Sequence, residues 1–220
     1  MKRSVLIIFL VLIIDQAVKL WVKTHMYLGQ EFRIIGDWFI VHFTENYGMA
    51  FGMEFGGESG KLLLSLFRLV FVIGIIWYVY QLTRKKYDKL YIITLSLIIA
   101  GAIGNLIDSA FYGMLFNGSE YQIATLFPVD GGYSSFLHGR VVDMLYFPVV
   151  EGNFPSWIPF WGGQEFIFFR PIFNVADSAI SIGVFMWIIF QKRFMKNGFG
   201  DDATLPVENS NSPSEQAATD

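Results

Sequence analysis

The sequence predicts an all-α membrane protein with four transmembrane helices, because it is strongly apolar and its apolar residues gather into four long segments. Of its 220 residues, 54% are apolar and only 16% are charged, and the mean hydropathy is +0.46. That balance is typical of a polytopic membrane protein and exceeds the apolar content of an ordinary soluble domain. Each segment is about 20 residues long, enough to cross a bilayer as a helix. We place the spans at about residues 4–22, 61–82, 90–108 and 171–190.

The first segment is compatible with a cleavable signal peptide or with a retained helix, since Lys2 and Arg3 precede it. However, Asp15 and Lys19 interrupt the apolar run, and no small-x-small cleavage site follows. We therefore expect it to remain as the first transmembrane helix.

The basic residues predict the orientation. Nine of the sixteen Lys and Arg residues fall on one side if both termini lie together: Lys2, Arg3, Arg84, Lys85, Lys86, Lys89, Lys192, Arg193 and Lys196. Since Lys and Arg accumulate on the cytoplasmic side, that side is expected to be the cytoplasm, and loops 23–60 and 109–170 face outward. Residues 1–196 form one membrane domain, and the polar tail 197–220 is expected to be disordered and cytoplasmic.

The outer loops contain the expected non-helical structure. Residues 34–43 are rich in Trp, Phe, Ile and Val, which predicts a strand, and residues 45–52 look like a turn. The aromatic segment 154–169 is too short, and too rich in proline, for a transmembrane helix. We expect it at the membrane interface, where Trp and Tyr are favoured.

Composition excludes several classes of function. The chain has no cysteine, which excludes disulfides, zinc thiolates and a cysteine nucleophile. The net charge is −3 and no basic stripe is present, so we expect no nucleic-acid partner. The three histidines, His25, His42 and His138, lack ligand spacing, and we assign no metal and no cofactor.

Polar residues inside the apolar segments require an explanation. An ionisable group at the centre of a membrane helix costs about 2.5–3.5 kcal/mol on insertion scales. Asn174 and Asp177 lie in the first two turns of the fourth predicted span, and their spacing places them on one face of that helix.

Two other spans also carry aspartates. Asp15 and Lys19 are one turn apart in the first span and can neutralise each other, either as a structural pair or as part of a site. Asn105 and Asp108 share a face with two glycines in the third span. Close helix packing explains those glycines but leaves the two polar groups directed at the same neighbour.

The fourth aspartate of interest, Asp143, lies in an apolar run of an outer loop, where a turn or cap residue is the simple interpretation. A pair of carboxylates in a low-dielectric site is different, because both cannot ionise cheaply. One keeps a proton and the other lacks it, so the pair can activate a water and protonate a leaving amine. This is aspartic-protease chemistry, but spacing does not decide which two of the four aspartates would form the pair.

Five sequence blocks, in order, resemble those of the lipoprotein signal peptidases, the type II signal peptidases of bacteria. The blocks are DQAVK at 15–19, NYGMAF at 46–51, GAIGNLID at 101–108, VVD at 141–143 and FNVADS at 173–178. The resemblance implies an aspartic endopeptidase of the bacterial inner membrane, with its active site near the outer face. Its substrate would be a prolipoprotein that carries a diacylglyceryl group, cleaved before the lipidated cysteine. Membrane lipid would surround the enzyme, and we expect a monomer.

By motif position, the resemblance implies that Asp143 and Asp177 are the catalytic dyad. Residues 34–43 would belong to a small extracytoplasmic β-sheet on which the substrate rests. The residues expected to bind substrate or support the site are Asp15, Lys19, Asn46, Gly48, Asn105, Asp108, Arg140 and Asn174.

The chain departs from the family pattern in two places. Ser109 stands where family members usually carry Arg, and we hypothesise that Arg140 substitutes for the missing guanidinium. The outer loops also carry insertions at about 111–137 and 148–167.

The main alternative is a small membrane transporter or proton relay, which also uses intramembrane Asp and Asn. Four spans without a visible repeat are few for alternating access. A structural protein whose polar residues only join helices, and a serine–lysine peptidase built on Ser178, are further alternatives.

Overall fold

The computed structural model describes residues 2–47, 57–148, 150–160, 162–168 and 171–198. Within these ranges, four helices are long and apolar enough to cross a membrane, judged by length and composition. They are α1 (Lys2–His25), α2 (Gly57–Arg84), α3 (Lys89–Ile107) with its continuation, and α5 (Val175–Gly198). The predicted fold class is confirmed.

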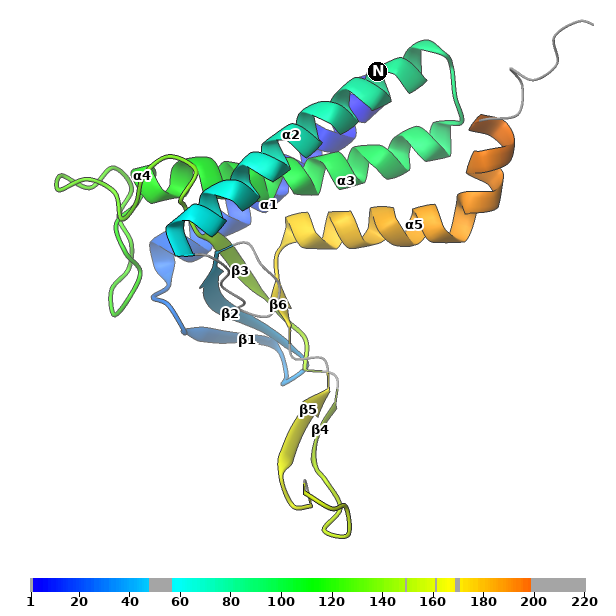
Figure 1. Cartoon of the computed structure of the whole chain (residues 1–220). Helices are drawn as coiled ribbons and strands as arrows, with labels where there is room; N and C mark the ends of the chain where they lie inside the picture. The colour runs from blue at the N-terminus through cyan, green and yellow to red at the C-terminus, as the bar shows by residue number, and fades with distance from the viewer. Residues whose placement is uncertain (1, 48–56, 149, 161, 169–170, 199–220) are drawn as a thin grey trace, which may run out of the picture.

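Helix α3 is the central element of the bundle and packs against α1, α2 and α5 (Figure 1). Glycines allow two of these approaches. A Cβ atom on Gly101 would lie 2.1 Å from the carbonyl oxygen of Ala176 in α5, and one on Gly104 would lie 2.7 Å from a carboxylate oxygen of Asp15 in α1. Any larger residue at either position would push α5 or α1 away from α3, and with it the polar groups described below.

The third span is longer than predicted. We expected it to end at Asp108, but the helix continues as a π-helical turn, η2 (Asp108–Tyr112), and a short helix, α4 (Gly113–Leu115). A π-helical turn changes the direction of the side chains that follow, and such turns often occur at functional sites.

A small antiparallel sheet lies at the end of the bundle where α1 ends and α5 begins (Figure 1). Its strands are β1 (Glu31–Ile35), β2 (Phe39–Asn46), β3 (Val141–Tyr146) and β6 (Ile172–Phe173), in the order β1-β2-β3-β6. A separate two-stranded hairpin consists of β4 (Val150–Asn153) and β5 (Glu165–Phe168). The sheet packs against α1 through a core that includes Val22, Phe43 and Met144.

The prediction of one strand over residues 34–43 is wrong. β1 ends at Ile35 and β2 begins at Phe39, and the two pair as a hairpin. Gly36 has φ +51°, a left-handed conformation that glycine adopts without steric cost and that reverses the chain here. Composition indicated β structure correctly, but the turn inside the segment was missed.

The predicted start of the fourth span is also wrong. Ile172 and Phe173 pair with Tyr146 and Leu145 of β3, so the chain is still extended there. The helix begins only at Val175. Strand pairing with a distant part of the sequence therefore overrides the apolar pattern that favoured an earlier helix.

The aromatic segment 154–169 forms the end of the β4–β5 hairpin, apart from residues 161 and 169, which lie outside the described residues. The hairpin extends away from the helix bundle, beyond the sheet (Figure 1). Trp157 and Phe160 near its tip are 79% and 94% exposed. Its location at the membrane interface stays a prediction, as does the disordered tail, most of which also lies outside the described residues.

We predict that the tip of this hairpin inserts into the membrane interface. Because the chain lacks cysteine, Phe160→Cys offers a unique site for a polarity-sensitive fluorophore. In lipid nanodiscs the label should report an apolar environment, since exposed aromatic tips partition into the interface. Asp130→Cys, at an exposed loop position, is the matched control and should report water. Identical emission from the two labels would contradict the prediction.

Candidate active site

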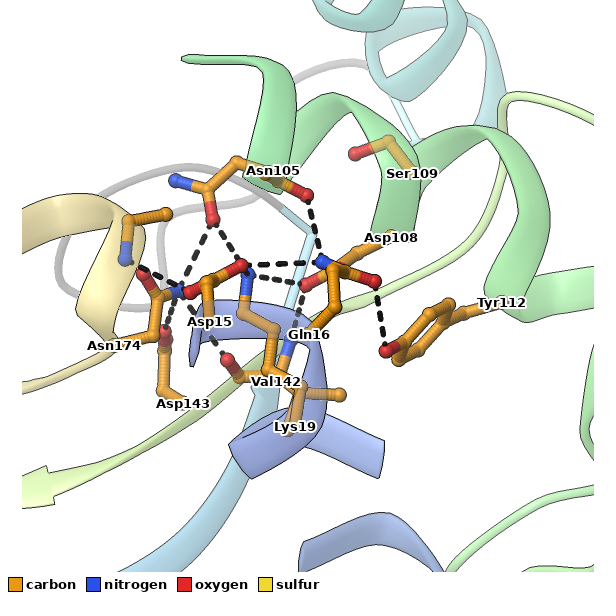
Figure 2. Close-up of polar contacts among 12 residues, drawn as sticks. Asp15, Gln16, Lys19, Asn105, Asp108, Ser109, Tyr112, Val142, Asp143 and Asn174 are labelled. Atoms are coloured by element: carbon orange, nitrogen blue, oxygen red, sulfur yellow. Dashed lines mark hydrogen bonds and ion pairs between the residues drawn. The ribbon is translucent and has the colours of Figure 1, made fainter. Parts of the chain in front are cut away.

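The ammonium group of Lys19 lies at the centre of a buried polar cluster between α1 and α3 (Figure 2). Its side chain is 0% exposed. The Nζ atom is 2.9 Å from Asp15 Oδ2 and 2.8 Å from Asp108 Oδ2, and it donates to Asn105 Oδ1 at 3.1 Å. These three acceptors match the three donors of an ammonium group. The predicted Asp15–Lys19 pair therefore includes two further partners from α3.

The two carboxylates beside Lys19 also hold other parts of the chain. Asp15 Oδ1 accepts a hydrogen bond of 2.8 Å from the backbone N–H of Ala176, in the first turn of α5. That N–H has no partner within its own helix. Asp108 Oδ2 accepts one of 3.2 Å from the backbone N–H of Val142 in β3. The cluster thereby fixes where α5 begins and where β3 crosses the bundle.

The π-helical turn after Ile107 positions the segment that leads into β3. The backbone N–H of Gly139 donates to the carbonyl oxygen of Ser109 at 2.9 Å. A Cβ atom on Gly139 would lie 2.2 Å from the carbonyl oxygen of Asp108, so a larger residue would displace this segment. Tyr112 at the end of the turn donates its hydroxyl to Gln16 Oε1 at 3.1 Å, which joins the turn to α1.

Asp143 lies in the middle of the sheet, on β3, and is 3% exposed. Its Oδ1 accepts a hydrogen bond of 2.8 Å from Asn174 Nδ2, and its Oδ2 accepts one from Asn46 Nδ2 on the neighbouring strand. Burial, and after it the charge of Asp177, raises the pKa of Asp143 to about 8. This carboxyl group is therefore largely protonated at neutral pH.

Asp177 lies in the first turn of α5, and a reciprocal cap with Asn174 fixes its position. Asn174 Oδ1 accepts from the backbone N–H of Asp177 at 2.8 Å, and Asp177 Oδ2 accepts from the backbone N–H of Asn174 at 3.4 Å. This is a capping-box arrangement, in which Asn174 precedes the helix. The sequence-based prediction that Asn174 lies within the first two turns of the helix is therefore wrong. Asn105 Nδ2 donates to Asp177 Oδ1 at 2.7 Å.

Asn174 is the residue that joins the two carboxyl groups. Its side-chain amide binds Asp143, while its backbone N–H binds Asp177. The amide nitrogen also lies 3.1 Å from Asn105 Oδ1, which completes a chain of contacts back to Lys19. Two carboxyl groups therefore face the same asparagine, but Asp143 is buried and Asp177 is partly exposed. Such a difference in environment is what a shared-proton pair requires.

A family model described as "Signal peptidase (SPase) II" matches residues 7–193. The chain belongs to the signal peptidase II family.

Curated relatives agree with this assignment. The chain is 53% identical to a lipoprotein signal peptidase of Porphyromonas gingivalis, over 91% of this chain and 87% of that one. It is 37% identical to a lipoprotein signal peptidase of Amoebophilus asiaticus, over 85% of this chain and 76% of the other. Membership of this family makes the chain a peptidase, and with its spanning helices it is a multi-pass bacterial membrane protein.

Solved structures support the fold. A bacterial membrane enzyme superposes with a TM-score of 0.57 at 22% identity, covering 93% of this chain and 95% of that one. A second bacterial membrane enzyme structure gives a TM-score of 0.56 at 25% identity, over 87% and 93% of the two chains. The fold shared with these membrane enzymes therefore extends over the bundle and the sheet together.

The sequence-predicted residues largely lie together. The cluster described above contains Asp15, Lys19, Asn46, Asn105, Asp108, Asp143, Asn174 and Asp177. Gly48 lies outside the described residues. No set of three His, Asp or Glu side chains suited to a metal ion occurs in the part of the chain that the structure describes.

Arg140 has partners other than the two carboxyl groups. Its Nη1 pairs with Glu45 at 3.4 Å and with Glu120, and its guanidinium lies over the rings of Tyr47 and Tyr133. Arg140 thus joins the insertion at residues 111–137, which contains Glu120, to Glu45 of β2. These contacts give it a structural role, and its proposed replacement of the family arginine remains a hypothesis.

Sequence reasoning missed several polar residues of this region. Lys23, one turn after Lys19, is buried and binds both Glu45 and Ser119. Lys61 of α2 donates to Ser109 Oγ at 3.1 Å. For Lys23 the sequence contained a detectable signal, because Lys19 and Lys23 are four residues apart and share one face of the first helix.

We predict that Lys19→Met strongly destabilises the protein, because two buried carboxylates would lose their cation. Breaking a buried ion pair on one side costs about 3–5 kcal/mol. Lys192→Met, at an exposed position of α5, is the control and should change stability little. The measurement is thermal unfolding in detergent micelles, followed by circular dichroism. Equal stability of the two variants would show that the cluster does not hold the fold.

Proposed function

We propose that this chain removes signal peptides from diacylglyceryl-modified prolipoproteins as an aspartic endopeptidase, with Asp143 and Asp177 as its catalytic dyad. Membership of the signal peptidase II family supports the removal of signal peptides and disfavours the transporter alternative. The observation that supports the dyad is the joint contact of Asn174 with both carboxyl groups.

The two carboxyl groups have different tasks in this mechanism. Asp177, as the carboxylate, takes a proton from a water molecule that attacks the scissile carbonyl carbon. Asp143, as the acid, stabilises the developing oxyanion by hydrogen bonding, and a dyad proton then passes to the leaving amine. The carbon–nitrogen bond breaks, which leaves a carboxylate on the signal peptide and an amine on the lipidated cysteine.

The assignment of the proton follows from the two environments. The raised pKa of Asp143, caused first by burial, favours its protonated form at neutral pH. Asp177 is partly exposed and accepts hydrogen bonds from Asn105 and from the backbone N–H of Asn174 at the start of α5. Water therefore reaches the base, while the acid remains buried.

The positions of charges along the helices support an active site near the outer face. The basic residues after α2 and before α3 share one end of the bundle with the C-terminal part of α5, where Arg193 binds Asp88. Strand β3, which carries Asp143, and the first turn of α5, which carries Asp177, lie at the opposite end of the bundle (Figure 1). If the basic end is cytoplasmic, both termini are cytoplasmic and the dyad lies near the outer interface.

This location suits a substrate that is itself anchored in the membrane. A signal peptide is an apolar helix, and the modified cysteine carries two acyl chains. A site at the interface lets the acyl chains remain in lipid during cleavage, which avoids a cost of about 0.8 kcal/mol for each methylene exposed to water. Because the two carboxyl groups supply the acid and the base, we expect cleavage to need no cofactor and the monomer to be active.

We predict that Asp143→Asn and Asp177→Asn each lower cleavage by a factor on the order of 10²–10⁴, the usual contribution of a general acid or base. The substrate is a prolipoprotein carrying the diacylglyceryl group, incubated with purified full-length protein. Asp130→Asn is the matched control and should cleave normally, while unmodified prolipoprotein should be cleaved poorly by all variants. Cleavage at close to the wild-type rate by either dyad variant, with folding verified, would contradict the assignment.

We predict that kcat/KM falls as the pH rises through about 8, because Asp143 loses the proton that makes it an acid. A group with a raised pKa is protonated below that value, so the acid form dominates at neutral pH. The measurement is the pH profile of cleavage by the wild-type protein under conditions where it stays folded. A profile that stays flat well above this pH would mean that Asp143 is not the titrating acid.

A further inference from the structure

The last two residues of β2 lie on opposite faces of the sheet. Asn46 donates its side-chain amide to Asp143, so it lies on the face that carries this acid. Because successive side chains of a strand point to opposite faces, Glu45 lies on the other face. The Glu45 side chain is 2% exposed and contacts both α1 and the insertion at residues 111–137. The residue next to Asn46 is therefore held by a separate, buried set of contacts.

The cation that pairs with Glu45 is Lys23 of α1, whose side chain is also buried. Its Nζ atom lies 5.4 Å from the ring centroid of Phe116 and 5.1 Å from that of Tyr133, so aromatic faces also stabilise the charge. Taking two charges out of water is costly, and a buried pair is weak evidence for stability. A better-attested use of such a pair is to fix one geometry.

Ser119 joins this pair to the segment that follows α1. Its hydroxyl accepts a hydrogen bond of 2.9 Å from Lys23 and donates one of 3.3 Å to Glu45. Its carbonyl oxygen accepts one of 3.0 Å from the backbone N–H of Leu28. Ser119 is itself buried. The insertion thus holds the end of α1, the segment before β1 and the end of β2 together.

Strand β2 is irregular just before this point. Val41 pairs with Leu145 and Thr44 pairs with Asp143, so three steps along β2 match two steps along β3. A bulge of this kind redirects the side chains beyond it, and bulges are common beside active sites. A shift of the strand by one residue would turn Asn46 away from the acid, because side chains alternate between the faces. An anchor directly beside Asn46 prevents such a shift.

We propose that Glu45, held by Lys23 and Ser119, is a positioning residue that keeps Asn46 on the acid of the catalytic dyad. It acts through the strand and touches neither the substrate nor the reacting atoms. This inference rests on the proposed aspartic mechanism. Its rival is that the cluster only attaches the insertion to the sheet.

The position of Asn46 has a measurable effect on the acid. Burial raises the pKa of Asp143 most, and the hydrogen bond from Asn46 opposes that rise, so losing this bond raises the pKa further. Loss of the negative charge of Glu45 would by itself act in the opposite direction. The direction of a shift therefore separates positioning from a direct effect of charge. The charged groups that act on Asp143, Asp177 of α5 and Lys19 of α1, stay unchanged.

The test is the pH profile of kcat/KM for Glu45→Gln, measured with diacylglyceryl-modified prolipoprotein and full-length protein. The limb at high pH, assigned to Asp143, should move upward by about half a unit to one unit, the equivalent of one hydrogen bond. Asn46→Ala should move it at least as far. Adding Glu45→Gln to Asn46→Ala should change the limb no further, because both act through one contact. Glu31→Gln, the matched control, removes a carboxylate that contacts His42 of β2 and should leave the limb in place.

An unchanged limb, or a move to lower pH, in a folded Glu45→Gln protein would overturn the inference and leave the cluster a structural role. Additive shifts in the double variant with Asn46→Ala would do the same. If Glu45→Gln does not fold because Lys23 stays buried without its partner, Lys23→Met/Glu45→Gln removes both charges and should show the same upward move. A fixed limb in that variant would equally overturn the inference. Failure of the aspartic mechanism itself is distinguishable, because Asp143→Asn in the same assay would then remain active.

Discussion

The buried ammonium of Lys19 is the contact on which the rest of the site depends. It binds Asp15 of the same helix together with Asp108 and Asn105 of α3. Asp15 also accepts from the first turn of α5 through its other oxygen, and Asp108 accepts from β3 through the oxygen that binds Lys19, so the cluster extends to both elements. One cation thus fixes three helices and a strand, and its loss would leave two carboxylates unpaired in a medium where that is expensive.

Around this cluster, asparagine residues set the geometry that carboxylates alone could not. Asn174 donates its side-chain amide to Asp143, accepts from the backbone N–H of Asp177 through its amide oxygen, and donates its own backbone N–H to the Asp177 carboxyl group. Asn105 accepts from Lys19 and donates to Asp177, which transmits the position of the ammonium to the dyad. The same contacts give the two carboxyl groups different surroundings, one buried in the sheet and one near the surface at a helix start.

The insertion at residues 111–137 is held to this scaffold by a second set of ion pairs. Lys23 binds Glu45 and Ser119, and Arg140 binds Glu45 and Glu120. Lys23 also lies over the ring of Phe116, so its charge is stabilised by an aromatic face as well as by a carboxylate. The insertion therefore rests on β2 and α1, next to the end of the strand that carries Asn46.

The sequence by itself determined features that depend on local order. Apolar length gave the four spans, the one-turn spacing gave the Asp15–Lys19 pair, and the order of five motifs pointed to Asp143 and Asp177. Only the tertiary structure placed Asn174 before α5, divided the predicted strand at Gly36, and brought Lys61 of α2 to Ser109 after α3. The physical reason is that strand pairing and buried charge contacts join residues far apart in the chain. Their energies exceed the local preferences from which a single sequence can be interpreted.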